Sequence, residues 1–149
     1  MSTSTPSITI TVKQVNRSLS SQEMINATER VQYTDKSVVA SIPSQGEGVE
    51  EDVPVEFFKL GYGSSPDELA QEYEERGITP DPYAVCQANT DDPAFADSHP
   101  NAVQWRDANG NLCYAAFGRD GGERHVSVRR DGDDWGDGWW FGGVRKLSA

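Results

Sequence analysis

The stretch VQWRDANGNLCYAAFGRDGGERHVSVRR, residues 103–130, contains the clearest structural pattern in the chain. Its ANGN segment, residues 108–111, holds an Asn-Gly pair, which is the strongest short signal for a tight turn between antiparallel strands. A second glycine turn follows at residues 120–122, and Val126 and Val128 then alternate with polar residues. The stretch therefore predicts three antiparallel strands, at residues 103–107, 112–119 and 124–130.

The sequence DGDDWGDGWW, residues 131–140, follows the third of these strands and precedes another apolar run. We interpret it as a glycine-rich loop that leads into a fourth strand at residues 139–146. The C-terminal part of the chain is then a four-stranded antiparallel meander. The predicted fold class is α+β, a mainly antiparallel sheet with two or three short helices packed on it.

Helix signals occur twice before the meander. Ser65 is followed by Pro66 and two acids, and Gly77 lies twelve residues after Ser65, which predicts a helix over residues 66–76 with a left-handed C-cap. Ser20 and Glu23 have the spacing of a capping box and predict a helix over residues 21–31. Asp81-Pro82 and Asp92-Pro93 each resemble the start of a short helix or a single helical turn.

The remaining N-terminal segments complete the predicted domain. Residues 7–13 alternate Ile or Val with Thr and predict a half-buried strand, and residues 37–42 and 53–60 predict two more strands. The glycine-rich acidic segment 44–52 predicts a mobile loop. We expect residues 1–6 to form a disordered tail and residues 7–149 to form a single α+β domain.

The charge of the chain is concentrated in its middle. The whole sequence carries a formal net charge of −11. Residues 61–100 hold nine acids and a single base, Arg76, which gives −8, whereas residues 101–149 hold seven of each. An acidic surface attracts basic partners at salt-dependent rates and repels nucleic acid.

This concentration of acids gives the leading functional hypothesis. We expect a small non-enzymatic interaction protein, an inhibitor or nucleic-acid mimic, that masks a basic surface of a partner protein by occupying its Lys and Arg side chains. A phage or mobile-element origin would suit such a role. The predicted contact residues are the acids of the middle segment: Asp67, Glu68, Glu72, Glu74, Glu75, Asp81, Asp91, Asp92 and Asp97.

Two alternatives come from the C-terminal half. Exposed tryptophans on a sheet can stack against sugar rings, so Trp135 and Trp140 are candidate contacts of a small-ligand or carbohydrate-binding module. Trp139 and Phe141 share the other side of their strand and are expected in the core. The second alternative is an enzyme with Cys113 as nucleophile and His125 as base, because the two residues lie on neighbouring predicted strands.

Metal binding is a further alternative in the loop of residues 131–140. Asp131, Asp133, Asp134 and Asp137 could form an irregular calcium cage, although the loop lacks the oxygen ligand at position 5 and the glutamate at position 12 of the helix-loop-helix calcium motif. A solvated hairpin loop explains the same acids without a metal.

Other classes of function lack sequence support. The chain has neither a phosphate-binding glycine motif nor a basic stripe with interleaved aromatics, so we expect no cofactor and no direct nucleic-acid contact. The N-terminus lacks a basic, apolar leader, and no apolar run reaches the length of a membrane span. We therefore expect a cytoplasmic protein without a membrane partner, and the sequence predicts no particular oligomeric state.

Overall fold

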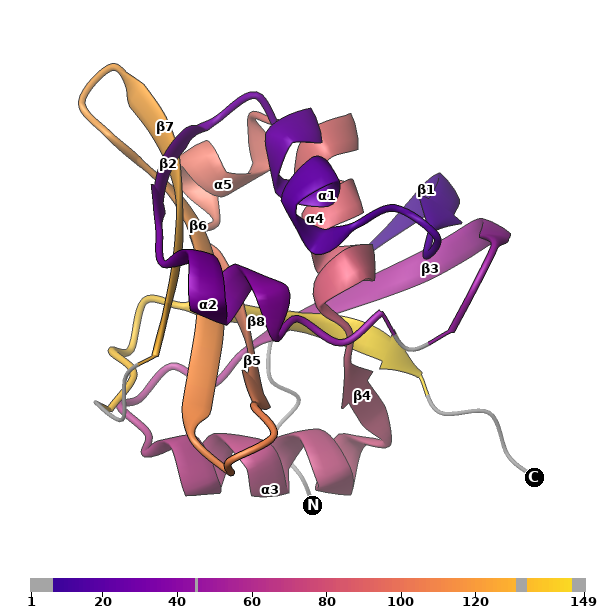
Figure 1. Ribbon diagram of the computed structural model, residues 1–149. Coiled ribbons are helices and arrows are strands. Elements are labelled where there is room, and N and C mark those ends of the chain that lie inside the picture. Colours follow the sequence, from indigo (N-terminus) through magenta and orange to yellow (C-terminus); the bar gives the residue numbers. More distant parts are fainter. Residues whose placement is uncertain (1–6, 45, 131–133, 146–149) are drawn as a thin grey trace.

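The computed structural model describes residues 7–44, 46–130 and 134–145, which form one twisted sheet with helices on both faces (Figure 1). The described strands are β1 (Ser7–Asn16), β2 (Val31–Thr34), β3 (Val49–Lys59), β4 (Ile78–Pro80), β5 (Asn101–Arg106), β6 (Leu112–Asp120), β7 (Glu123–Arg130) and β8 (Trp140–Arg145). The described helices are α1 (Ser21–Ala27), α2 (Lys36–Ala40), α3 (Pro66–Arg76), α4 (Pro82–Asp91) and α5 (Phe95–Ser98). This composition agrees with the predicted α+β class, although the five described helices exceed the two or three that were predicted.

The three central predicted strands are confirmed, but the fourth strand of the meander is not where the sequence placed it. β5, β6 and β7 are successive antiparallel neighbours. β8, however, lies between β3 and β5, antiparallel to the first and parallel to the second. β7 instead pairs in parallel with β2, and the strand order is β1-β3-β8-β5-β6-β7-β2. β8 is buried on both faces from Trp140 to Gly143, as suits a central strand.

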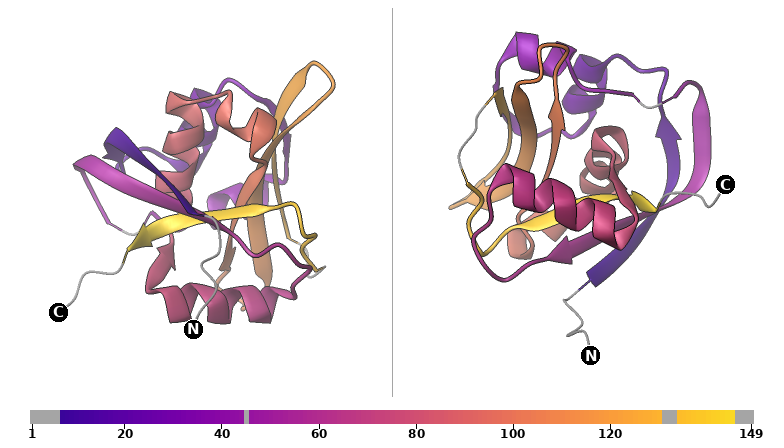
Figure 2. Two further views of the ribbon diagram at one scale, coloured as in Figure 1. Left: turned by 180° about the vertical axis from the view of Figure 1, so that it is seen from behind. Right: turned by 90° about the horizontal axis from the view of Figure 1, so that it is seen from below.

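Helix α3 follows its sequence signals closely. Ser65 forms a capping box with Glu68, and Gly77 adopts a left-handed conformation with φ of 68°. Its buried residues are Leu69 and Tyr73, four apart, so one stripe of the helix packs on the sheet. Figure 2 shows α3 lying across the sheet on the side away from α4.

The first helix and the segment after it depart from the prediction. α1 ends at Ala27, and Glu29, with φ of 57°, turns the chain into β2. Residues 37–42 do not form the predicted strand, because Asp35 caps a helical turn by accepting a hydrogen bond from the Ser37 amide. A helical turn buries both Val38 and Val39, whereas a strand would point them to opposite faces. The predicted mobile loop at 44–52 is also too long, since β3 begins at Val49.

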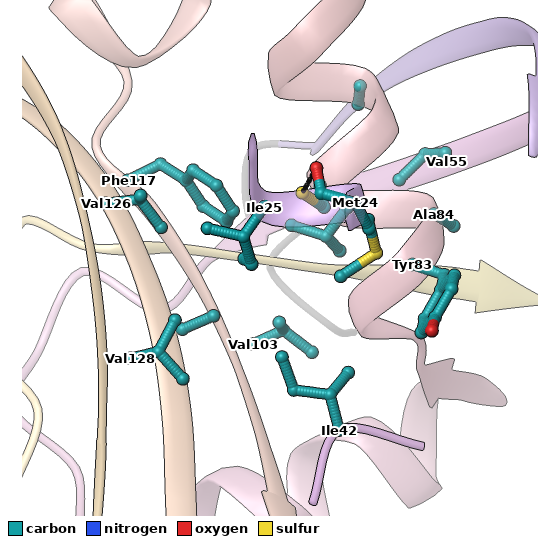
Figure 3. Close-up of a cluster of buried hydrophobic side chains, with 14 of the residues drawn as sticks. Met24, Ile25, Ile42, Val55, Tyr83, Ala84, Val103, Phe117, Val126 and Val128 are labelled. Atoms are coloured by element: carbon teal, nitrogen blue, oxygen red, sulfur yellow. Dashed lines mark hydrogen bonds between the residues drawn. The ribbon is translucent and has the colours of Figure 1, made fainter. Parts of the chain in front are cut away.

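Two apolar clusters cover the two faces of the sheet. The larger lies under α1, α2, α4 and α5, where Met24 and Ile25 of α1 meet Val103, Phe117 and Val126 of the sheet (Figure 3). The smaller lies under α3 and contains Phe58, Leu69, Tyr73, Trp135 and Phe141. α3 is the described helix that packs on this second face. The part of the face formed by β6 and β7 is therefore the candidate region for a functional site.

Candidate functional site

The acids predicted to contact a partner lie at opposite ends of the molecule. Asp67, Glu68, Glu72, Glu74 and Glu75 belong to α3, whereas Asp91, Asp92 and Asp97 lie on or after the far end of α4 (Figure 1). Asp91 accepts a hydrogen bond from Gln87, and Asp92 ends α4 as its C-cap rather than starting α5. The acidic segment is therefore continuous in sequence but forms two separate surfaces.

Asp81 has a structural role that the sequence did not reveal. Its side chain is 1% exposed and accepts two hydrogen bonds from the Arg17 guanidinium, at 3.0 and 2.7 Å. It also caps α4 by accepting from the Ala84 amide. The assignment of Asp81 as a partner-binding residue is therefore wrong, because burial leaves no room for a partner to reach it.

Several of the other acids already have basic partners within the chain. Asp97 binds Arg124 at 2.7 Å and Arg119 at 3.2 Å, and these contacts hold the pKa of Asp97 below its usual value. On α3, Glu72 pairs with Arg76, and Asp67 pairs with Arg106 across to β5. The field of each surface is thus weaker than the count of acids suggests.

The proposed dyad is not assembled. Cys113 is fully buried in the larger apolar cluster, on the helix-covered face. His125 pairs with Gly118, five residues along β6 from Cys113, or about 17 Å at the rise of a strand. An odd spacing also puts the two side chains on opposite faces. The hypothesis of a Cys113–His125 nucleophile and base is therefore contradicted by the strand register.

Trp135 and Trp140, proposed together as ligand contacts, lie on opposite faces of the sheet. Trp140 is 8% exposed, belongs to the cluster under α4 and α5, and has its ring 5.2 Å from that of His99. Trp135 belongs to the cluster under α3. A single ligand cannot contact both, and Trp140 is covered by its own fold.

Trp135 is held firmly on the α3 face. Its backbone exchanges two hydrogen bonds with Ser64, and its indole N–H donates to the Gln104 side chain at 3.0 Å. Gln104 in turn donates to the Pro66 carbonyl at the start of α3. These contacts carry the segment before β8 back across the sheet face, which is why β8 does not pair with β7.

A pocket of about 260 Å³ opens between this segment and the sheet. We call it the sheet-face pocket. Its floor consists of Leu112, Tyr114 and Ala116 from β6 and His125 and Ser127 from β7, and its wall consists of Asp134, Trp135 and Trp139. Three of these residues, His125, Asp134 and Trp135, are candidate site residues in the sequence, but each is predicted there for a different site.

The pocket combines a mostly apolar lining with a few polar groups. The Tyr114 and Trp135 rings are 5.3 Å apart at 76°, and the Trp135 and Trp139 rings are 5.6 Å apart at 72°. Within the described residues, Nδ1 of His125 is buried without a hydrogen-bond partner, while its Nε2 lies 3.3 Å from Asp120. A rigid, concave aromatic surface with few polar groups is the usual form of a small-molecule site.

Tyr114, Ser127 and Trp139 line the pocket but are not among the site residues predicted from the sequence. The alternation on β6 and β7 placed Tyr114 and Ser127 on one face, because every second residue shares a side. Trp139 is half-buried against Trp135 and not enclosed in the core. The missing information was the path of residues 134–139 over that face, which depends on the contact between Trp135 and Ser64.

The proposed calcium cage falls partly outside the described residues, since Asp131 and Asp133 are not among them. Asp134 lines the sheet-face pocket, and Asp137 is exposed. Across the part of the chain that the structure describes, no three His, Cys, Asp or Glu side chains are grouped to hold a metal ion. The described helices also include none long and apolar enough to cross a membrane.

Comparison of the chain with protein-family models, with curated proteins and with solved structures finds no match.

Proposed function

We propose that this protein is a non-enzymatic binding protein that holds a small ligand in the sheet-face pocket. The observation that carries the proposal is the pocket itself, with Tyr114, Trp135 and Trp139 around a volume of about 260 Å³. That size suits a single ring or a small head group rather than an extended chain. We favour binding over catalysis because five of the eight lining residues are aliphatic or aromatic.

Anchoring of the aromatic wall supports this proposal. Trp135 is fixed through Ser64 and Gln104, so the wall needs little ordering when a ligand arrives. A preformed site loses less conformational entropy on binding than a flexible one, which favours measurable affinity even for a small ligand.

The test is a saturation-transfer NMR screen of monosaccharides, small amines and small aromatic compounds against three variants. Ala116→Leu fills the pocket from its floor, and Trp139→Ala removes part of its wall. Tyr62→Ala is the matched control, because Tyr62 is an aromatic residue that is 54% exposed elsewhere on the surface. We expect hits that the first two variants lose and the control keeps. A silent screen, or hits that survive both pocket variants, would overturn the proposal.

A second candidate function comes from the outward face of α3. Asp67, Glu68, Glu74 and Glu75 are exposed on this eleven-residue helix. We propose that this face contacts a basic surface of a partner protein and masks it, in the manner of an inhibitor or nucleic-acid mimic. Long-range attraction of this kind speeds association at low salt and weakens as salt screens it.

Two double variants that each remove two negative charges distinguish a docking role for α3 from a general effect of net charge. Glu74→Gln with Glu75→Gln alters α3, and Asp91→Asn with Asp92→Asn alters the opposite end. The partner would first be captured from lysate and eluted with a salt gradient. We expect the α3 variant to bind it several-fold more slowly at low salt, with the difference vanishing at high salt. Equal rates for both variants would argue against a docking role for α3.

A further inference from the structure

The charged and neutral side chains of the sheet-face pocket restrict the ligands that it could bind. Among its described lining residues, Asp134 is the side chain that carries a full charge, and it is exposed at the rim. Ser127 is neutral, and His125 lies next to the exposed carboxylate of Asp120. A ligand in the pocket would therefore lie beside a carboxylate and several aromatic rings.

The arrangement of these rings matters because the face of an aromatic ring is electron-rich. Trp135 stands nearly perpendicular to both Tyr114 and Trp139, at 76° and 72°. Three rings in two perpendicular pairs present π-faces in more than one direction. Where the face of such a ring borders a pocket, it attracts a cation whose charge is spread over methyl groups, since this cation gives up little hydration on entering.

Arg129 lies on the same strand ladder as the pocket floor, but it is not among the lining residues of the pocket. Arg129 pairs with Tyr114 across the ladder between β6 and β7. Its side chain is exposed and lines a separate hollow beside β2, together with Gln32 and Asp35. The guanidinium therefore lies outside the lining of the sheet-face pocket.

We infer that the ligand of the sheet-face pocket is the quaternary ammonium group of a small molecule, such as choline. The methyl groups would contact Tyr114 and Trp139, with Trp135 behind them and the carboxylate of Asp134 balancing the charge. The inference rests on the proposed function, because it names the ligand class of the same pocket.

The test compares choline with 3,3-dimethylbutan-1-ol by isothermal titration calorimetry at low salt. The alcohol has the shape of choline without its charge, so any difference reports the cation itself. We expect choline to bind at least about ten-fold more tightly than the alcohol. A peptide carrying trimethyllysine serves as a further arm. Tighter binding of the peptide than of choline would overturn the assignment to a small molecule.

Substitutions test the aromatic part and the carboxylate part of the site separately. Trp139→Ala should weaken choline binding about ten-fold or more, because a π-face is lost. Asp134→Asn should weaken it several-fold at low salt and less at high salt. Asp137→Asn removes the same charge from an exposed residue of the same segment and should change little, as should Tyr62→Ala. Equal effects of the two aspartate variants would contradict a specific role for Asp134.

Failure of this inference is distinguishable from failure of the proposed function. If the alcohol, a sugar or another neutral compound binds as tightly as choline, and Ala116→Leu abolishes that binding, the pocket is a ligand site but not a cation site. If choline and the compounds of the screen all fail to bind, both the inference and the proposed function are overturned.

Discussion

Arg17 and Asp81 form a buried ion pair that joins the end of β1 to the start of α4. Their side chains are 4% and 1% exposed, and Arg17 also contacts Glu50 and the Ser44 carbonyl. Removing one partner of a buried ion pair is strongly destabilising, because the remaining charge loses its buried counter-charge; without Asp81, Arg17 would keep the more exposed carboxylate of Glu50. A residue expected to face a partner is thus part of the internal framework.

Replacing Asp81 with Asn should therefore destabilise the fold strongly. Asn still caps a helix, so the change isolates the loss of charge opposite Arg17. We expect a loss of about 3–5 kcal/mol in the free energy of unfolding, measured by urea denaturation. Asp67→Asn breaks an exposed pair with Arg106 and should cost less than about 1 kcal/mol. Similar losses of unfolding free energy for the two variants would contradict the distinction between a buried and an exposed ion pair.

The two cysteines should behave as core residues. Burial raises the pKa of the Cys86 thiol to about 12, and Cys113 is 0% exposed. The thiolate is the reactive form, so neither thiol should react readily with a disulfide reagent at neutral pH in the native protein. We expect reaction of both only after denaturation. Rapid labelling of Cys113 in the folded state would reopen the hypothesis of a catalytic thiol.

At the scale of elements, β8 depends on glycine for its central place. A Cβ on Gly143 would lie 2.2 Å from the Thr79 carbonyl oxygen of β4, and one on Gly142 would lie 2.6 Å from the Phe57 ring. We expect Gly143→Ala to lower the free energy of unfolding by about 1–3 kcal/mol. Gly122→Ala, with open space around it, is the control. An unchanged denaturation midpoint in Gly143→Ala would mean that β4 can move away freely.

The contact between α5 and the β6–β7 hairpin should depend on pH. Arg124 and Arg119 lower the pKa of Asp97 in the folded state. The stability gained is therefore complete above the unfolded pKa of about 3.9 and is lost as pH falls through the lower folded pKa. The melting temperature of Asp97→Asn should lie below that of the unaltered protein at pH 7, and the gap should shrink below about pH 4. A gap that stays constant down to pH 2.5 would contradict this role.

Elements with local signals were predictable, and elements set by distant contacts were not. The capping box at Ser65, the left-handed Gly77 and the Asn-Gly hairpin each depend on a few neighbouring residues. The position of β8 depends instead on Trp135 meeting Ser64, about 70 residues earlier in the chain. The local sequence of a short run such as residues 37–42 is compatible with a strand or a helical turn, and packing against the core selects one of them.

For the molecule as a whole, the fold class and the net charge can be obtained from the sequence, but the positions of the acidic and aromatic side chains relative to one another cannot. The acids of the middle segment looked like one surface, yet the helices that carry them lie at opposite ends (Figure 1). The aromatic residues looked like separate candidates, yet the path of residues 134–139 gathers Tyr114, Trp135 and Trp139 at one pocket. Both outcomes follow from chain topology, which local patterns do not determine.

The central claim, that the sheet-face pocket is a ligand site, can be tested by NMR of the four tryptophan indole N–H groups during titration with choline, or with the tightest compound of the screen. Trp135 and Trp139 line the pocket, whereas Trp105 and Trp140 belong to the cluster on the opposite face. We predict saturable shifts of the Trp135 and Trp139 signals while those of Trp105 and Trp140 stay in place. Absence of any shift, or equal shifts of all four signals, would contradict the claim.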